Sequence, residues 1–463
     1  MAKLWDKGYS LDALIERFTV GDDYLLDRRL IAADAVASIA HARMLASVEI
    51  ISSDDADALE RELRAIAAEA VASGFAIRRD QEDSHTFIEE RLVESLGEAG
   101  KRIHTGRSRN DQVLASTRLF AREGILAVRS ELATAIDALC GLAEREESTP
   151  MPGRTHMQPA MPSTIGLWAA SYAEALLDTD ALLEGAYRLV NRSPLGAAAS
   201  FGVPLPLDRE LVADLLGFDS VQHNVLDVVS SRGRIEMIVL DAFDQIGITL
   251  GRLASDLIVF SLPEFGYFSL PAELCSGSSI MPQKRNPDGL ELMRGKSATL
   301  SSFADRVRNV IRSTPSAYNR DVQETKEPLV RGIDLTIDLL SVAELTARKL
   351  VVDRERLVAG FTPDIFATDV ALDAVSRGTS FRDAYRETAA TLSSIEASQF
   401  DLAEVIARRT ATGTPGNVGI DHARAGLARI RDGLASERER VGAAVQRLAG
   451  AELLLYPGSP AER

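Results

Sequence analysis

Cysteine, aromatic residues and long apolar runs are all scarce in this chain of 463 residues. Two cysteines, Cys140 and Cys275, are too few and too far apart for a disulfide framework or a cysteine-based zinc site. No stretch of about 18 uncharged apolar residues occurs, and the N-terminal residues lack the apolar segment of a secretory signal. We therefore expect no membrane partner and a reducing, cytoplasmic location.

Positive charge is also in deficit, because 52 Lys and Arg residues stand against 68 Asp and Glu residues, a net charge of −16. A chain of this sign repels nucleic acid, so no nucleic-acid partner is expected. Hydrophobic residues make up 46% of the chain and charged residues 26%, a composition that indicates a globular fold and excludes a disordered chain. An acidic substrate would need positive charge concentrated locally.

What the sequence does contain is long helical periodicity. Apolar residues recur every three or four positions in four stretches, roughly 112–146, 165–190, 235–260 and 327–352. Each stretch is longer than the usual globular helix of about 11–12 residues. Such helices must bury their apolar stripes against one another, which predicts a mainly α protein with a central long-helix bundle. We expect this bundle to mediate oligomerisation, with a monomeric bundle as the alternative.

Shorter patterns flank the bundle and predict three domains. They are an N-terminal helical domain (1–110), a central bundle domain that carries the catalytic loops (111–360) and a small C-terminal helical domain (361–463). The last of these shows helical patterns at 364–377, 380–396, 401–409 and 421–449. Strand-like alternation is sparse.

Polar loops between the long helices hold most of the chemistry. HTGRSRNDQV (104–113) places two arginines and Asn110 before a helix, which suits a carboxylate or phosphate, although a solvated helix cap explains it as well. Thr155 and His156 lie in a proline-bracketed loop at 150–164, where the imidazole could move protons or serve only a structural role.

Two further loops carry hydroxyl, ammonium and amide groups. GSSIMPQKRNPD (277–288) combines Ser278 with Lys284 and Asn286 and could close over a ligand, with lysine stabilising an alkoxide or an oxyanion. In SAYNRDVQETKEP (316–328), Tyr318 precedes Arg320, Gln323 and Lys326, which share a face if a helix begins here. A mobile surface loop and a solvated helix start are the alternatives.

Together these segments resemble the fumarase/aspartase superfamily. GSSIMPQKRNP is similar to its signature loop, and HTGRSRNDQV and AYNRDVQETKEP narrow the resemblance to argininosuccinate lyases. The resemblance covers essentially the whole chain. It implies a three-domain helical subunit, a homotetramer with a multi-helix core, and active sites where loops of three subunits meet. It also implies the reversible β-elimination of argininosuccinate to arginine and fumarate, an arginine-biosynthetic step, without cofactor or metal.

The same resemblance implies residue roles. Ser278 and His156 exchange the protons, and Lys284 and Asn286 stabilise the negative charge that develops on the substrate. The positions that match substrate-binding residues are Asn110, Thr155, Asn286, Tyr318, Gln323 and Lys326. Which of Ser278 and His156 is the base stays open.

One departure concerns the N-terminal substrate-binding serine of that family, which is missing from FTVGDDY (18–24). The alternatives are another fumarate-releasing lyase, such as adenylosuccinate lyase, and a catalytically silent structural relative. In either enzyme reading, positive charge should gather around the ligand from Arg107, Arg109, Lys284, Arg285, Arg320 and Lys326.

Overall fold

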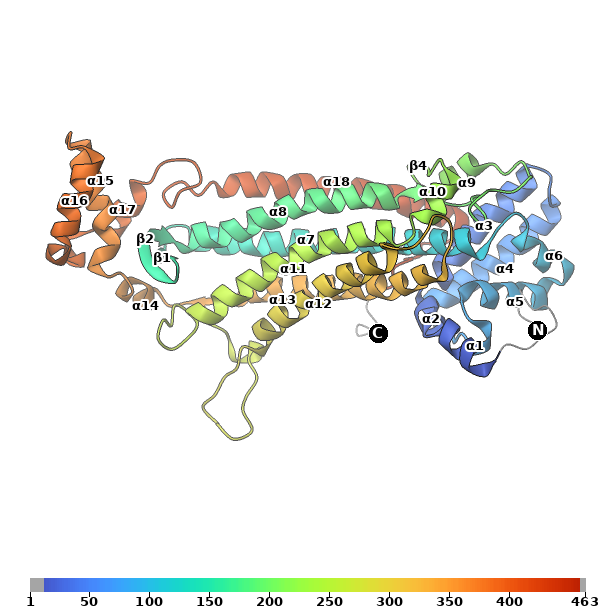
Figure 1. The fold of residues 1–463 in the computed structure, drawn as a ribbon, viewed down its shortest axis with the longest axis horizontal. Coiled ribbons are helices and arrows are strands. Elements are labelled where there is room, and N and C mark those ends of the chain that lie inside the picture. The colour runs from blue at the N-terminus through green and yellow to red at the C-terminus, as the bar shows by residue number, and fades with distance from the viewer. Residues whose placement is uncertain (1–11, 459–463) are drawn as a thin grey trace.

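Six long helices run alongside one another through the middle of the molecule (Figure 1). The computed structural model describes residues 12–458, and within this range the long helices are α7 (Arg109–Arg145), α8 (Ile165–Val190), α11 (Arg234–Phe260), α12 (Asp288–Ile311), α13 (Lys326–Lys349) and α18 (Ile420–Ala449). Each of the four predicted periodic stretches coincides with one of them. The predicted mainly α fold with a long-helix bundle is therefore confirmed.

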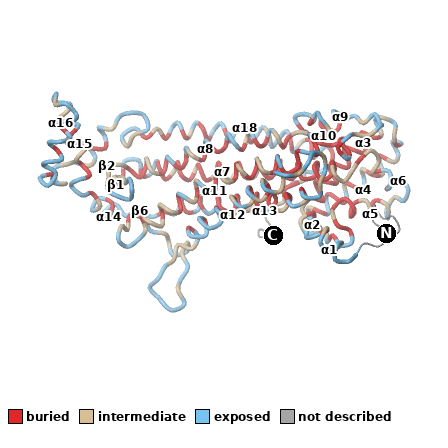
Figure 2. Tube along the Cα trace, in the orientation of Figure 1, coloured by how far each residue is buried: buried red, intermediate tan, exposed pale blue. Residues whose placement is uncertain are grey.

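The bundle is held together by the apolar stripes that the spacing predicts. Ile235, Ala242, Ile246 and Leu253 are all buried on α11, and their cluster continues through α7, α8, α12 and α13. Figure 2 shows the buried positions following the inner faces of these helices. Burial of one stripe per helix thus fixes the bundle and leaves its ends free to carry loops.

A second hydrophobic cluster lies at one end of the bundle. It is formed mainly by α3 (Ile31–Ser47), α4 (Ser53–Ala72) and α5 (Ser84–Leu96), with help from α9 (Arg209–Leu215). The short helices α1 (Ala13–Val20), α2 (Asp23–Leu26), α6 (Glu98–Lys101) and α10 (Val225–Ser230) lie at the same end (Figure 1).

The opposite end carries a small helical group with its own apolar cluster. Its helices are α14 (Arg354–Ala359), α15 (Ala367–Ser376), α16 (Phe381–Ala390) and α17 (Leu402–Ala407). Phe366 and Phe400 stack there with ring centroids 4.3 Å apart. The chain then returns along the bundle as α18, so the last hundred residues contribute to both ends of the molecule.

Three two-stranded sheets complete the fold. They are the antiparallel β1 (Pro150–Thr155) with β2 (Gln158–Thr164), the parallel β3 (Arg192–Ser193) with β4 (Ser220–Val221), and the antiparallel β5 (Phe268–Ser269) with β6 (Val351–Val352). The segment 150–164 is therefore a β-hairpin, and the prediction of a proline-bracketed loop is wrong. Its prolines are tolerated because a two-stranded hairpin consists only of edge strands.

None of the helices described is by itself long and apolar enough to cross a membrane. A bent pair of helices, Asp23–Arg29 and Ile31–Ser47, is together long and apolar enough to cross a membrane. Nearly all residues of the second helix, however, are buried in the protein.

Candidate functional site

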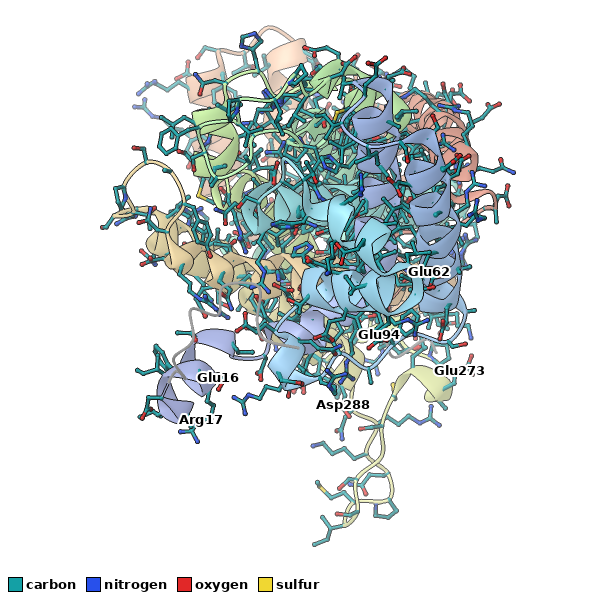
Figure 3. The ribbon with its side chains drawn as sticks, turned by 90° about the vertical axis from the view of Figure 1, so that its right-hand side faces the viewer. Glu16, Arg17, Glu62, Glu94, Glu273 and Asp288 are labelled. Carbon is teal, nitrogen blue, oxygen red and sulfur yellow. The ribbon has the colours of Figure 1, made fainter. Side chains whose placement is uncertain are left out.

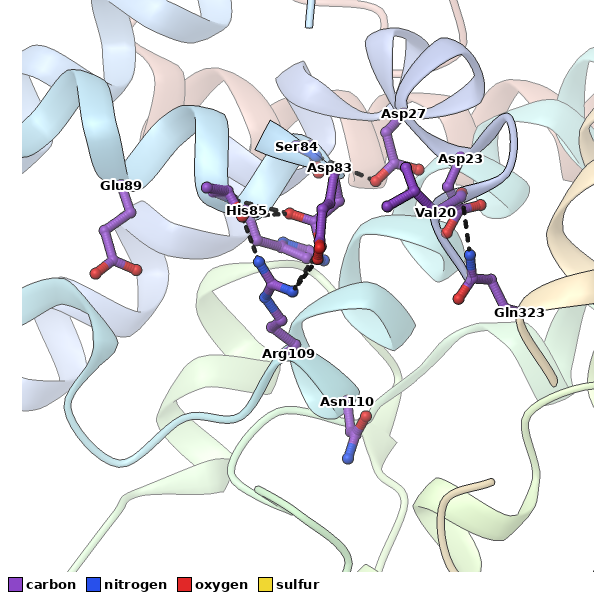
Figure 4. Close-up of polar contacts among 12 residues, drawn as sticks. Val20, Asp23, Asp27, Asp83, Ser84, His85, Glu89, Arg109, Asn110 and Gln323 are labelled. Carbon is purple, nitrogen blue, oxygen red and sulfur yellow. Dashed lines mark hydrogen bonds and ion pairs between the residues drawn. The ribbon is translucent and has the colours of Figure 1, made fainter. Parts of the chain in front are cut away.

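A cavity of about 390 Å³ opens where the bundle meets the N-terminal helices, and two of the predicted loops border it. Asn110 enters from the start of α7, and Tyr318, Gln323 and Lys326 enter from the segment that leads into α13. These residues are separated by about two hundred positions in the sequence, and all four were predicted to bind substrate. The structure brings them together, as the close-up in Figure 4 shows for Asn110 and Gln323.

Local helix geometry explains how each loop reaches the cavity. The Ser108 hydroxyl accepts a hydrogen bond from the Asn110 amide (3.3 Å) and Asp111 accepts one from the Ser108 amide (2.9 Å), a capping box that starts α7. A 3₁₀ segment, Arg320–Thr325, precedes Lys326. Residues three apart eclipse in a 3₁₀ helix, so Arg320, Gln323 and Lys326 share a face, as predicted.

Lys326 forms the charged floor of this cavity. Its side chain is 3% exposed, and its ammonium group lies 2.5 Å from Asp27 Oδ1 and 3.2 Å from Asp23 Oδ2. Burial alone would lower the pKa of Lys326, but Asp27 and Asp23 raise it above its usual value. The lysine therefore stays protonated, with a third N–H donor beyond the two that face these carboxylates.

The segment that carries the two aspartates is fastened to the cavity wall. The Arg320 guanidinium donates to the Thr19 carbonyl (2.8 Å), and the Gln323 amide donates to the Thr19 and Val20 carbonyls (3.2 and 3.5 Å). These bonds hold the turn between α1 and α2 at the cavity, within the segment 18–24 that lacks the serine expected from the family resemblance.

Arg107 and Arg109 do not offer free positive charge to the cavity. Arg109 pairs with Glu82 (3.0 Å) and Asp83 (3.6 Å), and Arg107 is buried with its guanidinium donating to the Ser38 hydroxyl (2.9 Å). The cavity lining contains four carboxylates and four Lys or Arg side chains. Within one chain the lining of this cavity is therefore balanced in charge, and Lys284 and Arg285 of the predicted positive set lie outside it.

A buried histidine–aspartate pair adjoins the cavity and was not predicted. His85 Nδ1 lies 2.6 Å from Asp34 Oδ2, and Ser84 Oγ donates to the same oxygen (3.0 Å). Burial opposes charge on the ring, but Asp34 and Asp83 raise the pKa of His85 above its usual value. The run Glu82–His85 is visibly polar in the sequence, but its partner lies in the apolar helix α3, which no local pattern singles out.

Thr155 and His156 lie at the tip of the β1–β2 hairpin. Thr155 pairs with Gln158, so His156 and Met157 form a two-residue turn, and both have positive φ angles (53° and 62°). Two-residue hairpin turns of this kind normally use Asn-Gly or a similar pair. A non-glycine pair held in this conformation at an exposed tip is a feature that clusters at functional sites.

Ser278, Lys284 and Asn286 belong to a long loop between α11 and α12 that projects away from the bundle (Figures 1 and 3). Reciprocal backbone hydrogen bonds between Ser276 and Asn286 (3.0 and 2.9 Å) close its neck. The Ser278 hydroxyl accepts from the Met281 amide (3.1 Å), while Lys284 is exposed. Ile280 at the tip is 82% exposed, so the loop presents both its apolar and its polar groups outward.

The predicted site residues thus form three separate groups in one chain: the cavity at the N-terminal end, the hairpin tip near the opposite end, and the projecting loop (Figure 1). No direct contact between these groups occurs among the hydrogen bonds and ion pairs of residues 12–458.

Comparison with known proteins gives this geometry a context. A family model described as lyase matches residues 8–301. The chain is 44% identical over 419 residues to an argininosuccinate lyase of Sorangium cellulosum, which covers 90% of this chain and 97% of that one. It is 40% identical over 387 residues to an argininosuccinate lyase of Thermotoga neapolitana, covering 84% and 97%.

Solved structures show the same fold at lower sequence identity. A crystal structure of EDDS lyase in complex with formate superposes with a TM-score of 0.81 at 23% identity, covering 97% of both chains. A class II fumarase from Schistosoma mansoni gives 0.68 at 16% identity, covering 94% of both chains.

Proposed function

Because this chain belongs to the argininosuccinate lyase family, we propose that its three groups of loop residues together split argininosuccinate. The chain is a carbon–nitrogen lyase, and the reaction is the reversible β-elimination that gives arginine and fumarate. The observation that carries the assignment of residues is the cavity, which gathers Asn110, Tyr318, Gln323 and Lys326 from two distant blocks of sequence.

The elimination needs one proton removed and one supplied. A base takes the proton from the carbon beside a carboxylate, the bond from the neighbouring carbon to the guanidine nitrogen breaks, and an acid protonates that nitrogen as arginine leaves. We assign the two proton transfers to Ser278 and His156. The intermediate carries extra negative charge on its carboxylate, which Lys284 and Asn286 stabilise by an ammonium and an amide.

The separation of the three groups supports a site shared between subunits. Within one chain the hairpin tip, the projecting loop and the cavity cannot contact one substrate molecule, because they lie at different places along an elongated bundle (Figure 1). We propose a homotetramer whose core is built from the long helices and in which each site takes the three groups from three subunits. A cytoplasmic location fits the two free cysteines, Cys140 and Cys275.

The activity is tested by supplying argininosuccinate and adenylosuccinate to the purified protein in parallel assays. We expect fumarate and arginine to appear in equal amounts from argininosuccinate, and no fumarate from adenylosuccinate. Fumarate release from adenylosuccinate alone, or none from either compound by a folded oligomer, would contradict the proposal.

A further inference from the structure

Asp23 occupies an unusual position for a carboxylate, because it shares one buried ammonium with a second and closer carboxylate. Asp27 lies 2.5 Å from Lys326 Nζ with its side chain 1% exposed, and Asp23 lies 3.2 Å away with its side chain 16% exposed. Asp27 is therefore the tight counter-ion of Lys326. Asp23 is the second carboxylate; both aspartates line the cavity, and Asp23 is the more exposed of the two.

The positive groups near Asp23 do not fully offset the cost of burying its negative charge. Burial raises the pKa of Asp23 to about 6, and Asp27 adds to the rise, while Lys326 and Arg232 act in the opposite direction. The nearby Arg320 donates to the Thr19 carbonyl and Gln323 to the Thr19 and Val20 carbonyls, and neither forms a hydrogen bond with Asp23 among the described residues. A cation entering the cavity would favour the charged form of Asp23.

The cavity also suits one end of the proposed substrate better than the other. Of the three groups proposed to form the site, this cavity is the one that contains neither Ser278 nor His156, so we place the end of the substrate away from the breaking bond here. The remaining end of argininosuccinate is the amino-acid head of its arginine part, which carries an ammonium and a carboxylate on one carbon. Such a zwitterion needs an anion and a cation placed side by side, as Asp23 and Lys326 are.

We propose that Asp23 is a specificity residue that binds the α-ammonium group of the arginine part of the substrate, beside Lys326, which faces its α-carboxylate. This inference rests on the proposed function for the identity of the ligand. It gives the segment 18–24, which lacks the family serine, a role of its own in recognising the substrate.

The test compares how arginine and 5-guanidinopentanoate, which lacks only the α-amino group, bind to three proteins by calorimetry. These are the wild type, Asp23→Asn and the control Asp22→Asn, which removes a neighbouring exposed carboxylate that makes no cap hydrogen bond. Asp23→Asn should lower the affinity for arginine by about tenfold or more, the usual effect of losing a charged hydrogen bond. Its affinity for 5-guanidinopentanoate should stay within about twofold of the wild-type value. Asp22→Asn should change neither affinity.

Equal weakening of both ligands by Asp23→Asn would show a purely structural role and overturn the inference, as would unchanged arginine binding. Should Asp23→Asn not fold, the wild type still tests it. The preference for arginine over 5-guanidinopentanoate should fall about fourfold from pH 8 to pH 5.5 as Asp23 becomes protonated. A preference that does not change with pH overturns the inference.

These measurements are separate from the test of the activity. An enzyme that cleaves argininosuccinate but binds arginine no better than 5-guanidinopentanoate would retain the proposed function and lose the inference. An enzyme that discriminates between the two ligands through Asp23 but releases no fumarate from argininosuccinate would contradict the proposed function and retain the binding role of Asp23.

Discussion

Single side chains in this protein are held by contacts that restrict what each can do. The positive φ of His156 at the hairpin tip costs about 1–3 kcal/mol of conformational free energy. The pairing of Thr155 with Gln158 holds the residue in this conformation. Lys326 is protonated but paired with two carboxylates, so we expect it to recognise a ligand only together with them. We infer that function depends on the positions of individual charged and polar side chains and not on the net charge of the chain.

At His156 we expect the His156→Asn variant to lower kcat by about 10²- to 10⁴-fold, because asparagine cannot exchange a proton near neutral pH. The turn itself should persist, since asparagine tolerates a positive φ better than most residues. The neighbouring Met157→Asn variant is the matched control and should keep kcat within about threefold. Steady-state kinetics beside a thermal unfolding curve distinguish chemistry from folding, and a fully active His156→Asn enzyme would refute the assignment.

At Ser278 the matched control is the next residue. Ser278→Ala should lose about 10²-fold or more in kcat with little change in unfolding temperature, because the residue lies outside the helices, in the loop before α12. Ser279→Ala removes an adjacent hydroxyl and should remain active. If the two alanine variants are equally active or equally impaired, Ser278 is not the reacting hydroxyl.

At the scale of elements, the helices were predictable and the hairpin was not. The spacing of apolar residues in α8 and α11 is a local signal, and it gave their extents within a residue or two. Prolines at 150, 152, 159 and 162 obscured the strands, because a proline signal does not distinguish a loop from an edge strand. Asp23 and Asp27 could not be identified because their partner, Lys326, is about three hundred residues away.

The close packing of the start of α8 against the backbone of Glu147 predicts how a substitution there changes the free energy of unfolding. Gly166 at the start of α8 has no room for a side chain, since a Cβ atom there would lie 2.6 Å from the Glu147 backbone. Gly166→Ala should therefore destabilise the protein by about 1–3 kcal/mol, measured by urea unfolding. Gly442→Ala in α18, where a Cβ atom meets nothing within 4 Å, should instead stabilise it by up to about 1 kcal/mol. A Gly166→Ala variant as stable as Gly442→Ala would contradict this packing.

At the scale of the whole molecule, the bundle separates the residues that we assign to the reaction. The four loop segments, their chemistry and their order could be recognised in the sequence, but their distribution over an elongated subunit could not, because it depends on helix lengths and directions (Figure 1). The division at residues near 110 and 360 remains a proposal. In the proposed tetramer, the cavity, the hairpin tip and the projecting loop become parts of one site through assembly.

The most direct test of this account mixes two inactive variants, Ser278→Ala and His156→Asn, after dissociation and reassembly of the oligomer. A site that takes the loop from one subunit and the hairpin from another finds both intact in about a quarter of random combinations, so about a quarter of wild-type activity should return. If the mixed oligomers form but no activity returns, Ser278 and His156 of each site come from the same subunit, and the shared-site account is wrong.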